Sequence, residues 1–121
     1  MSNYKRLDVW QQSMELVKEI YLTTKKFPKE ELYALTSQTK RAAVSIPCNI
    51  AEGVGRNYKK DTIQFLHVSR GSLYELETLL VVAFNTGILM LEKYSKLNEM
   101  VEKTLQVLGG LIRYLGKAEL K

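Results

Sequence analysis

With 121 residues, of which 45% are hydrophobic and 26% charged, the chain has the length and composition of one globular domain, which excludes a disordered, fibrous or disulfide-stapled protein. Its 2 Pro and 7 Gly are too few for an all-β chain with many tight turns, and they favour long helices. The net charge of +5 lies entirely in residues 1–60, which carry 11 basic and 6 acidic side chains against 7 of each in residues 61–121, so the charge indicates either a polyanionic partner (nucleic acid or an anionic membrane surface) or a basic surface that serves solubility.

The first predicted helix covers about residues 8–26. Asp8 is its candidate N-cap, and Gln11 follows at the spacing of a capping box. One buried stripe is predicted, whose members step by four, three and four residues: Trp10, Met14, Val17 and Tyr21. The helix ends at Phe27-Pro28, because the residue before Pro is pushed out of the α region and Pro has no amide hydrogen to donate.

The second predicted helix covers about residues 30–54 and begins somewhere between Lys29 and Thr36. Pro47 lies inside it and removes the hydrogen bond to the Ala43 carbonyl. We interpret Pro47 as an internal kink, since helical spacing continues through it; the alternative is that it begins a new helical segment. Gly53-Val54-Gly55 ends this helix.

The third predicted helix covers about residues 58–86, with Asn57 as its cap and Gly87 at its end. Two serines, Ser69 and Ser72, interrupt its apolar stripe of Leu66, Leu73, Leu76, Leu80 and Phe84. The fourth helix covers about residues 91–116 and has a regular apolar stripe. Long helices joined by short connections predict a single all-α domain, an antiparallel up-and-down four-helix bundle over residues 1–121.

The run Leu79 to Phe84 is apolar on every side of its helix, so only part of it can face the bundle interior. A surface this apolar is usually covered, and a second copy of the chain would cover it. We therefore expect self-association. The alternative is that the fourth helix and the loop before it cover the run within one chain.

Little in the sequence supports catalysis. A di-iron site in a helical bundle needs Glu-x-x-His pairs, and the single histidine, His67, has Gln64 where the Glu would stand. The single cysteine, Cys48, excludes an internal disulfide and a cysteine-based zinc site. We predict no catalytic residues, no metal, no cofactor and no enzyme activity. With no apolar segment typical of a secretory signal or of a membrane span, we expect a cytoplasmic protein without membrane contact.

Polar residues on the two middle helices predict a polar layer inside the bundle. One stripe of the second helix contains Arg41, Ser45, Asn49 and Glu52, and the third helix contributes Ser69, Ser72 and Glu75. A buried charge without a partner would cost several kcal/mol, so we expect Arg41 to pair with Glu75 or Glu52. The layer is either a structural network that fixes helix register or a ligand pocket.

Several motifs together resemble a known family. They are Phe27-Pro28, Gln38-x-Lys40-Arg41-Ala42, Ser45-Ile46-Pro47-x-Asn49-Ile50-Ala51-Glu52-Gly53, and Phe65-Leu66 followed by Gly71-Ser72-x-x-Glu75-Leu76. Across nearly the whole chain, this pattern resembles the four-helix bundle family encoded within intervening sequences of bacterial 23S ribosomal RNA genes. That family is similar in fold to the accessory variability protein of diversity-generating retroelements, a basic homopentamer that binds nucleic acid beside a reverse transcriptase.

The resemblance implies a homo-oligomer, a pentamer by analogy, whose partners are RNA and a reverse transcriptase or another protein. Family membership fixes fold better than function. The candidate contacts to nucleic acid are the cations around the first and second connections, together with one on a helix face: Lys25, Lys26, Lys29, Lys40, Arg56, Lys59 and Lys60. We predict phosphate-backbone binding to structured RNA or an RNA–DNA hybrid; the alternative is a protein-interaction or structural oligomer without a nucleic-acid ligand.

Overall fold

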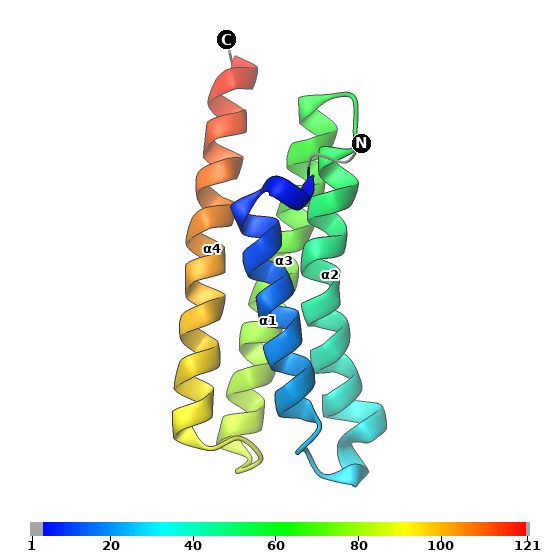
Figure 1. Ribbon diagram of the computed structural model, residues 1–121, viewed down its shortest axis with the longest axis vertical. Coiled ribbons are helices and arrows are strands. Elements are labelled where there is room, and N and C mark those ends of the chain that lie inside the picture. Colours follow the sequence, from blue (N-terminus) through cyan, green and yellow to red (C-terminus); the bar gives the residue numbers. More distant parts are fainter. Residues whose placement is uncertain (1–3, 121) are drawn as a thin grey trace.

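The computed structural model describes residues 4–120, and within that range the chain forms four long α-helices in antiparallel, up-and-down order (Figure 1). They are α1 (Asp8–Thr24), α2 (Ser37–Val54), α3 (Lys59–Asn85) and α4 (Leu91–Leu120). The α1–α2 and α3–α4 connections meet at one end, here called the lower end (Figure 1). The α2–α3 connection lies at the upper end, toward which α1 begins and α4 ends. The predicted fold class is therefore confirmed.

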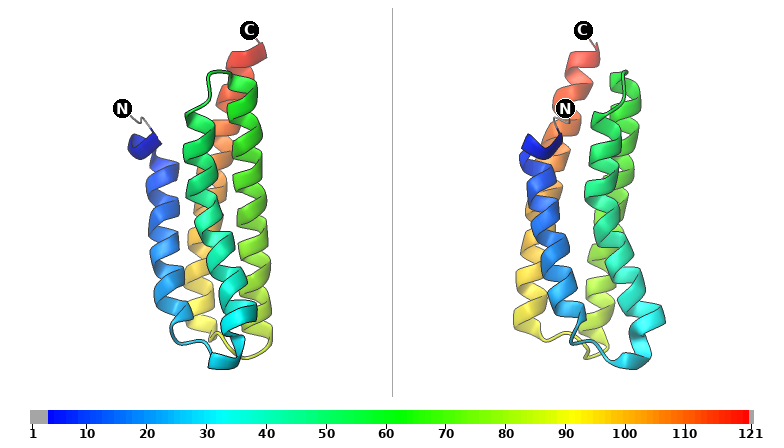
Figure 2. Two further views of the ribbon diagram at one scale, coloured as in Figure 1. Left: turned by 90° about the vertical axis from the view of Figure 1, so that its right-hand side faces the viewer. Right: turned by 45° about the vertical axis from the view of Figure 1, so that its right-hand side comes forward.

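The helices form two pairs that face each other across the core, α1 beside α4 and α2 beside α3 (Figure 2). Every helix contributes fully buried side chains, the largest of which are Leu16, Ile20, Ile46, Ile50, Leu66, Leu73, Leu76, Leu80, Leu97, Val101 and Leu108. Burial of this apolar surface is the main favourable contribution to folding.

The buried face of α1 differs from the predicted one. Val9, Leu16 and Ile20 are buried, whereas Met14 and Tyr21 are exposed and the other two members of the predicted stripe are only half-buried. The true stripe also steps by four, three and four residues, but it includes Ser13, whose hydroxyl donates to the Trp10 carbonyl at 2.7 Å. A serine at a core position hides the stripe from a search for apolar periodicity, because its hydroxyl is satisfied within its own helix.

Both predicted N-caps were wrong. Leu7 caps α1 without a side-chain hydrogen bond, and Asp8 is the first helical residue, where its charge still favours the helix N-terminus. Gln11 donates instead to the Lys5 carbonyl, at 2.9 Å, outside the helix. At α3 the cap is the extended residue Tyr58, one position after the predicted Asn57.

Between α1 and α2 the chain turns through Phe27-Pro28 and resumes helical conformation at once. Lys29–Glu31 forms a 3₁₀ turn and Leu32–Thr36 a π-helical turn, and these lead directly into α2. The second helix was predicted to begin between Lys29 and Thr36. These residues are helical, but in 3₁₀ and π conformation, and the α-helix itself begins at Ser37. Pro47 lies inside α2, which continues through it as predicted.

The upper part of α2 lies very close to α3. At Gly53 a Cβ atom would lie 2.8 Å from the Phe65 Cβ and 3.1 Å from the Thr62 carbonyl oxygen. The Thr62 hydroxyl also donates to the Gly53 carbonyl, at 2.7 Å. Gly53 thus has a packing role beyond ending the helix, because only a residue without a side chain permits this approach. At the other end of α3, Gly87 has a φ of 79°, which only Gly adopts readily, and it stops the helix as predicted.

The apolar run from Leu79 to Phe84 is covered mostly by the same chain. Leu79, Leu80 and Ala83 are buried, and the Phe84 ring stacks on Tyr94 of α4 with ring centroids 4.9 Å apart. Val82, which is 42% exposed, is the member of the run that reaches the surface. Over residues 4–120, no helix has the combined length and hydrophobicity that a bilayer crossing demands.

Candidate nucleic-acid interface

Three of the predicted cations gather on one small cavity at the lower end of the bundle. The α1–α2 connection is anchored by Phe27, which is buried, so the neighbouring lysines are left exposed. Lys25, Lys29 and Lys40 all line a cavity of about 180 Å³. Lys40 is the fourth residue of α2 and lies beside the connection.

The cationic surface continues from Lys40 onto the outer face of α2. The Lys40 ammonium lies 4.7 Å from the centroid of the Tyr21 ring, a cation–π contact that holds its side chain against α1. Lys40 also lines a second, larger hollow of about 750 Å³, which we call the α2 groove. The groove is lined by polar and charged residues from three helices: Tyr21, Gln38, Lys40, Arg41, Ser45 and Glu75.

Arg41 lies in this groove and not inside the bundle, which corrects the predicted buried ion pair. Its side chain is exposed, as is that of Glu75 of α3, which also lines the groove, and no ion pair within 4.0 Å joins them. Glu52 is exposed as well and pairs with Arg56 at 2.7 Å. The reason is rotational: Ala42, Ala43 and Ile46 occupy the core side of α2, so the preceding Arg41 points outward.

The inner part of the predicted polar layer is a small hydroxyl cluster between α2 and α3. The Ser45 and Ser72 hydroxyls share a hydrogen bond of 2.8 Å, and Asn49 donates to the Ser45 carbonyl at 2.8 Å and to its hydroxyl at 3.0 Å. Ser69, fully buried, donates to the Ile46 carbonyl at 2.8 Å. The Ser45–Ser72 and Ser69–Ile46 bonds join the two helices through neutral groups, which avoids the cost of burying charge.

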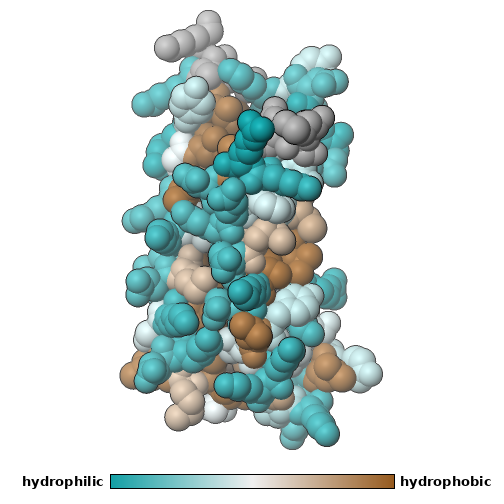
Figure 3. Space-filling model, in the orientation of Figure 1, coloured by the Kyte–Doolittle hydropathy of each residue, from teal (hydrophilic) through white to brown (hydrophobic). Residues whose placement is uncertain are grey.

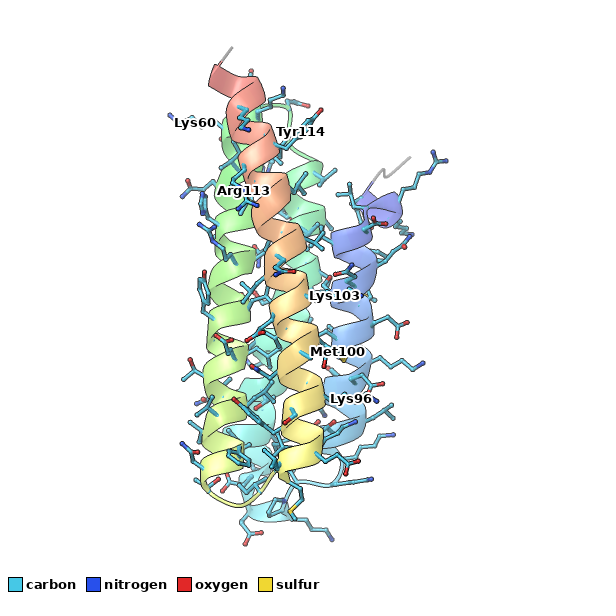
Figure 4. The ribbon with its side chains drawn as sticks, turned by 90° about the vertical axis from the view of Figure 1, so that its left-hand side faces the viewer. Lys60, Lys96, Met100, Lys103, Arg113 and Tyr114 are labelled. Atoms are coloured by element: carbon cyan, nitrogen blue, oxygen red, sulfur yellow. The ribbon has the colours of Figure 1, made fainter. Side chains whose placement is uncertain are left out.

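The second group of predicted cations, Arg56, Lys59 and Lys60, lies at the upper end and is exposed. Arg56 is engaged by Glu52, and its guanidinium lies 4.7 Å from the centroid of the Phe65 ring. Figure 4 shows Arg113 and Tyr114 of α4 at the same end as Lys60. Arg113 was not among the predicted cations, because the regular stripe of α4 indicates only the apolar face of that helix. The two groups of cations are separated by the length of the bundle.

At the lower end, Lys93 of α4 is a further cation that the sequence analysis missed. Its ammonium donates to Glu19 at 3.2 Å, and Lys96 lies 3.9 Å from the same carboxylate oxygen. The hydrogen bond from Lys93 holds the pKa of Glu19 below its ordinary value; partial burial opposes this, and the charges of Lys93, Lys96 and Lys18 add to it. Glu19 thus neutralises part of the positive charge beside α4.

Cys48 and His67 show no arrangement for chemistry. Cys48 is exposed, and His67 shares a 2.8 Å hydrogen bond between its Nδ1 and Nη2 of Arg70 on the same helix. Within the described residues, no three His, Cys, Asp or Glu side chains are grouped so that they could hold a metal ion.

Comparison with known proteins places the chain in a family. Residues 5–110 match the family model described as 23S rRNA-intervening sequence protein. A similar solved structure is a protein of the S23 ribosomal protein family from Bacteroides thetaiotaomicron VPI-5482, itself described as of unknown function, with 24% identity over 87% of this chain and 95% of that one and a TM-score of 0.81. No curated protein is similar enough to match. The family match covers most of the chain and the same bundle recurs in that structure, so this chain belongs to the 23S rRNA-intervening sequence protein family.

Proposed function

We propose that this chain is a non-enzymatic, homo-oligomeric module that binds nucleic acid through the phosphate backbone, with structured RNA or an RNA–DNA hybrid as its ligand. One observation carries the proposal. Lys40 lines both the lower-end cavity, with Lys25 and Lys29, and the α2 groove, with Arg41, so that these cations form one continuous surface. Together with Lys26, we call them the basic surface.

The acidic residues around the basic surface limit how phosphate would approach it. Glu75 of α3 also lines the α2 groove, and Glu30 lies exposed in the connection. The Glu31 carboxylate is turned toward its own backbone, where it accepts from the Leu35 amide at 3.4 Å. Phosphates would therefore lie between the connection and Lys40, on the side of Arg41 away from Glu75.

The oligomeric part of the proposal is supported by the outer face of α3. Val68, Tyr74 and Val82 are exposed there, by 48%, 53% and 42%, on a helix whose opposite face is in the core. The same face is the observation that favours the second candidate function, a protein-interaction oligomer. That function requires no contact between the basic surface and nucleic acid.

The test is a fluorescence-anisotropy titration with a structured RNA, an RNA–DNA hybrid and a single-stranded DNA, between roughly 50 and 200 mM salt. The variant Lys25→Gln/Lys29→Gln/Lys40→Gln should weaken RNA binding and reduce the slope of log K against log salt by about 1 for each lost phosphate contact. The matched control is Arg56→Gln/Lys59→Gln/Lys60→Gln, which removes the same formal charge at the upper end and should bind nearly as wild type does.

Two outcomes contradict the proposal. If wild type shows no RNA binding at physiological salt, the basic surface is a solvated face and the second candidate function stands. If the two triple variants lose equal affinity, binding follows net charge alone and no surface has been located.

A further inference from the structure

A second cavity at the lower end differs in character from the basic surface. It has a volume of about 590 Å³ and lies between the α1–α2 and α3–α4 connections. The lining is largely apolar and comes from the last turn of α1 and from both connections: Leu22, Phe27, Ile88, Leu89 and Met90. Apolar side chains reach the surface here among hydrophilic ones (Figure 3), and Met90 is 74% exposed. A hollow of this size with an apolar lining is typical of a site for a small molecule.

The α3–α4 wall of the cavity has a fixed shape. After the turn at Gly87, the amides of Ile88 and Leu89 both donate to the Ala83 carbonyl, at 2.9 and 3.0 Å. Leu89 is buried in the core, so the backbone that carries Ile88 and Met90 is held from beneath. The opposite wall is the last turn of α1 and the buried Phe27. The cavity is therefore formed by ordered backbone on both sides.

One polar group in the lining has no partner. Thr23 lines the cavity and is 6% exposed, and its hydroxyl makes no hydrogen bond within the described part of the chain. The neighbouring Thr24 behaves as buried threonines in helices usually do, since its hydroxyl donates to the Ile20 carbonyl at 2.8 Å. A buried hydroxyl without a partner is costly. Its oxygen is shielded from solvent, so an oxygen atom of a bound ligand would supply the missing bond once the Thr23 side chain rotated toward the cavity.

The remaining lining residues set the charge that a ligand would need. Lys25, Lys26 and Lys93 stand around the apolar part, and no Asp or Glu is among the described lining residues. Glu19, which binds the Lys93 ammonium, is the carboxylate that opposes them. Lys25 and Lys26 have no ion pair within 4.0 Å in the structure as described. An anionic group is the complement of this arrangement.

We propose that the cavity binds a small amphipathic anion, an aliphatic or aromatic carboxylate whose apolar part lies between the two connections and whose charged group lies among Lys25, Lys26 and Lys93 near Thr23. The site goes beyond nucleic-acid binding and does not depend on it. The two share Lys25 and Lys26, so an occupied cavity would compete with phosphate for these lysines.

The proposal is tested by titrating the full chain with the fluorescent anion 8-anilinonaphthalene-1-sulfonate and displacing it with decanoate or, as the uncharged comparison, 1-decanol. Decanoate should displace the dye from one site per chain and should compete at least about tenfold better than decanol, because the lysines recognise only the anion. Lys25→Gln/Lys26→Gln should weaken decanoate binding roughly tenfold. Lys59→Gln/Lys60→Gln, with the same charge change at the upper end, should leave it unchanged.

Thr23→Val tests for a specific contact between ligand and protein without changing the charge of the chain. Valine keeps the shape of threonine and removes the hydroxyl, so the chain should fold at least as stably while decanoate binds about two- to tenfold more weakly. Equal competition by decanol and decanoate, no saturable binding, or binding that ignores both substitutions would each overturn the proposal. Failure of decanoate to bind would leave the proposed RNA binding standing, because RNA binding is measured separately with a different ligand.

Discussion

Replacement of Gly53 by alanine tests the close approach of α2 to α3. The new Cβ would lie 2.8 Å from the Phe65 Cβ and 3.1 Å from a backbone oxygen of α3, and neither is the free end of a flexible side chain. Overpacking of this kind costs about 1–3 kcal/mol. Alanine also gains up to about 1 kcal/mol over glycine in a helix, so the net change depends on how far α2 and α3 can separate.

The matched control is Gly71→Ala in α3, since Gly71 is exposed and a Cβ there would meet nothing within 4 Å. It should raise the free energy of unfolding by about 0.5–1 kcal/mol. Gly53 lies near a helix end, so its gain in helix propensity on replacement by alanine is at most that of Gly71. The free energies of unfolding of the two variants should therefore differ by at least the packing cost, about 1–3 kcal/mol. Urea denaturation followed by circular dichroism, at one protein concentration, measures this difference. If Gly53→Ala were as stabilising as Gly71→Ala, the reasoning about the close approach would be refuted.

Three further substitutions test the polar groups. Ser69→Ala removes the buried hydrogen bond to the Ile46 carbonyl and should lower the free energy of unfolding by about 0.5–1.5 kcal/mol in the same urea assay. Arg41→Ala should change the free energy of unfolding by less than about 0.5 kcal/mol, because the side chain is exposed. If the variant instead lost its folded NMR spectrum, Arg41 would have the buried structural role that the sequence predicted. Glu19→Gln should destabilise the protein slightly, by up to about 1 kcal/mol, with the full effect above about pH 4.5; because the pKa of Glu19 is lowered from 4.5, the effect should fade as pH falls below 4.5 and through the folded value. A difference from wild type that did not shrink as the pH was lowered below 4.5 would show that this ion pair is not its cause.

The sequence predicted the helices well because their ends coincide with strong signals. Phe27-Pro28, the Gly53 to Gly55 segment and Gly87 each oppose helix for a local reason, and each lies at or just beyond a helix end. The faces of the helices were harder to predict. In α1 the buried stripe lies one residue before the predicted one. It contains Ser13, so a search for apolar periodicity does not find it.

The candidate site was only partly predictable for a related reason. Arg41 was assigned to the interior because it follows the spacing of Ser45 and Asn49, but neighbouring stripes of a helix differ by a small rotation and the alanines beside it occupy the core. The lysines of the connection are evident in the sequence. That Lys40 lines the same cavity depends on how α2 packs against α1, which the sequence does not show. The cavity between the two connections joins segments more than 60 residues apart, and no local pattern encodes it.

The even number of antiparallel helices within residues 4–120 has a practical consequence for handling the molecule. The start of α1 and the end of α4 both lie toward the upper end (Figure 1). The apolar cavity and the lysines of the basic surface belong to the lower end. A fluorophore, an affinity tag or a tether to a sensor chip can therefore be joined at either terminus and stand a full helix length, roughly 30 Å, from the surfaces to be probed. An immobilised chain would present its lower end outward, toward added RNA or carboxylate.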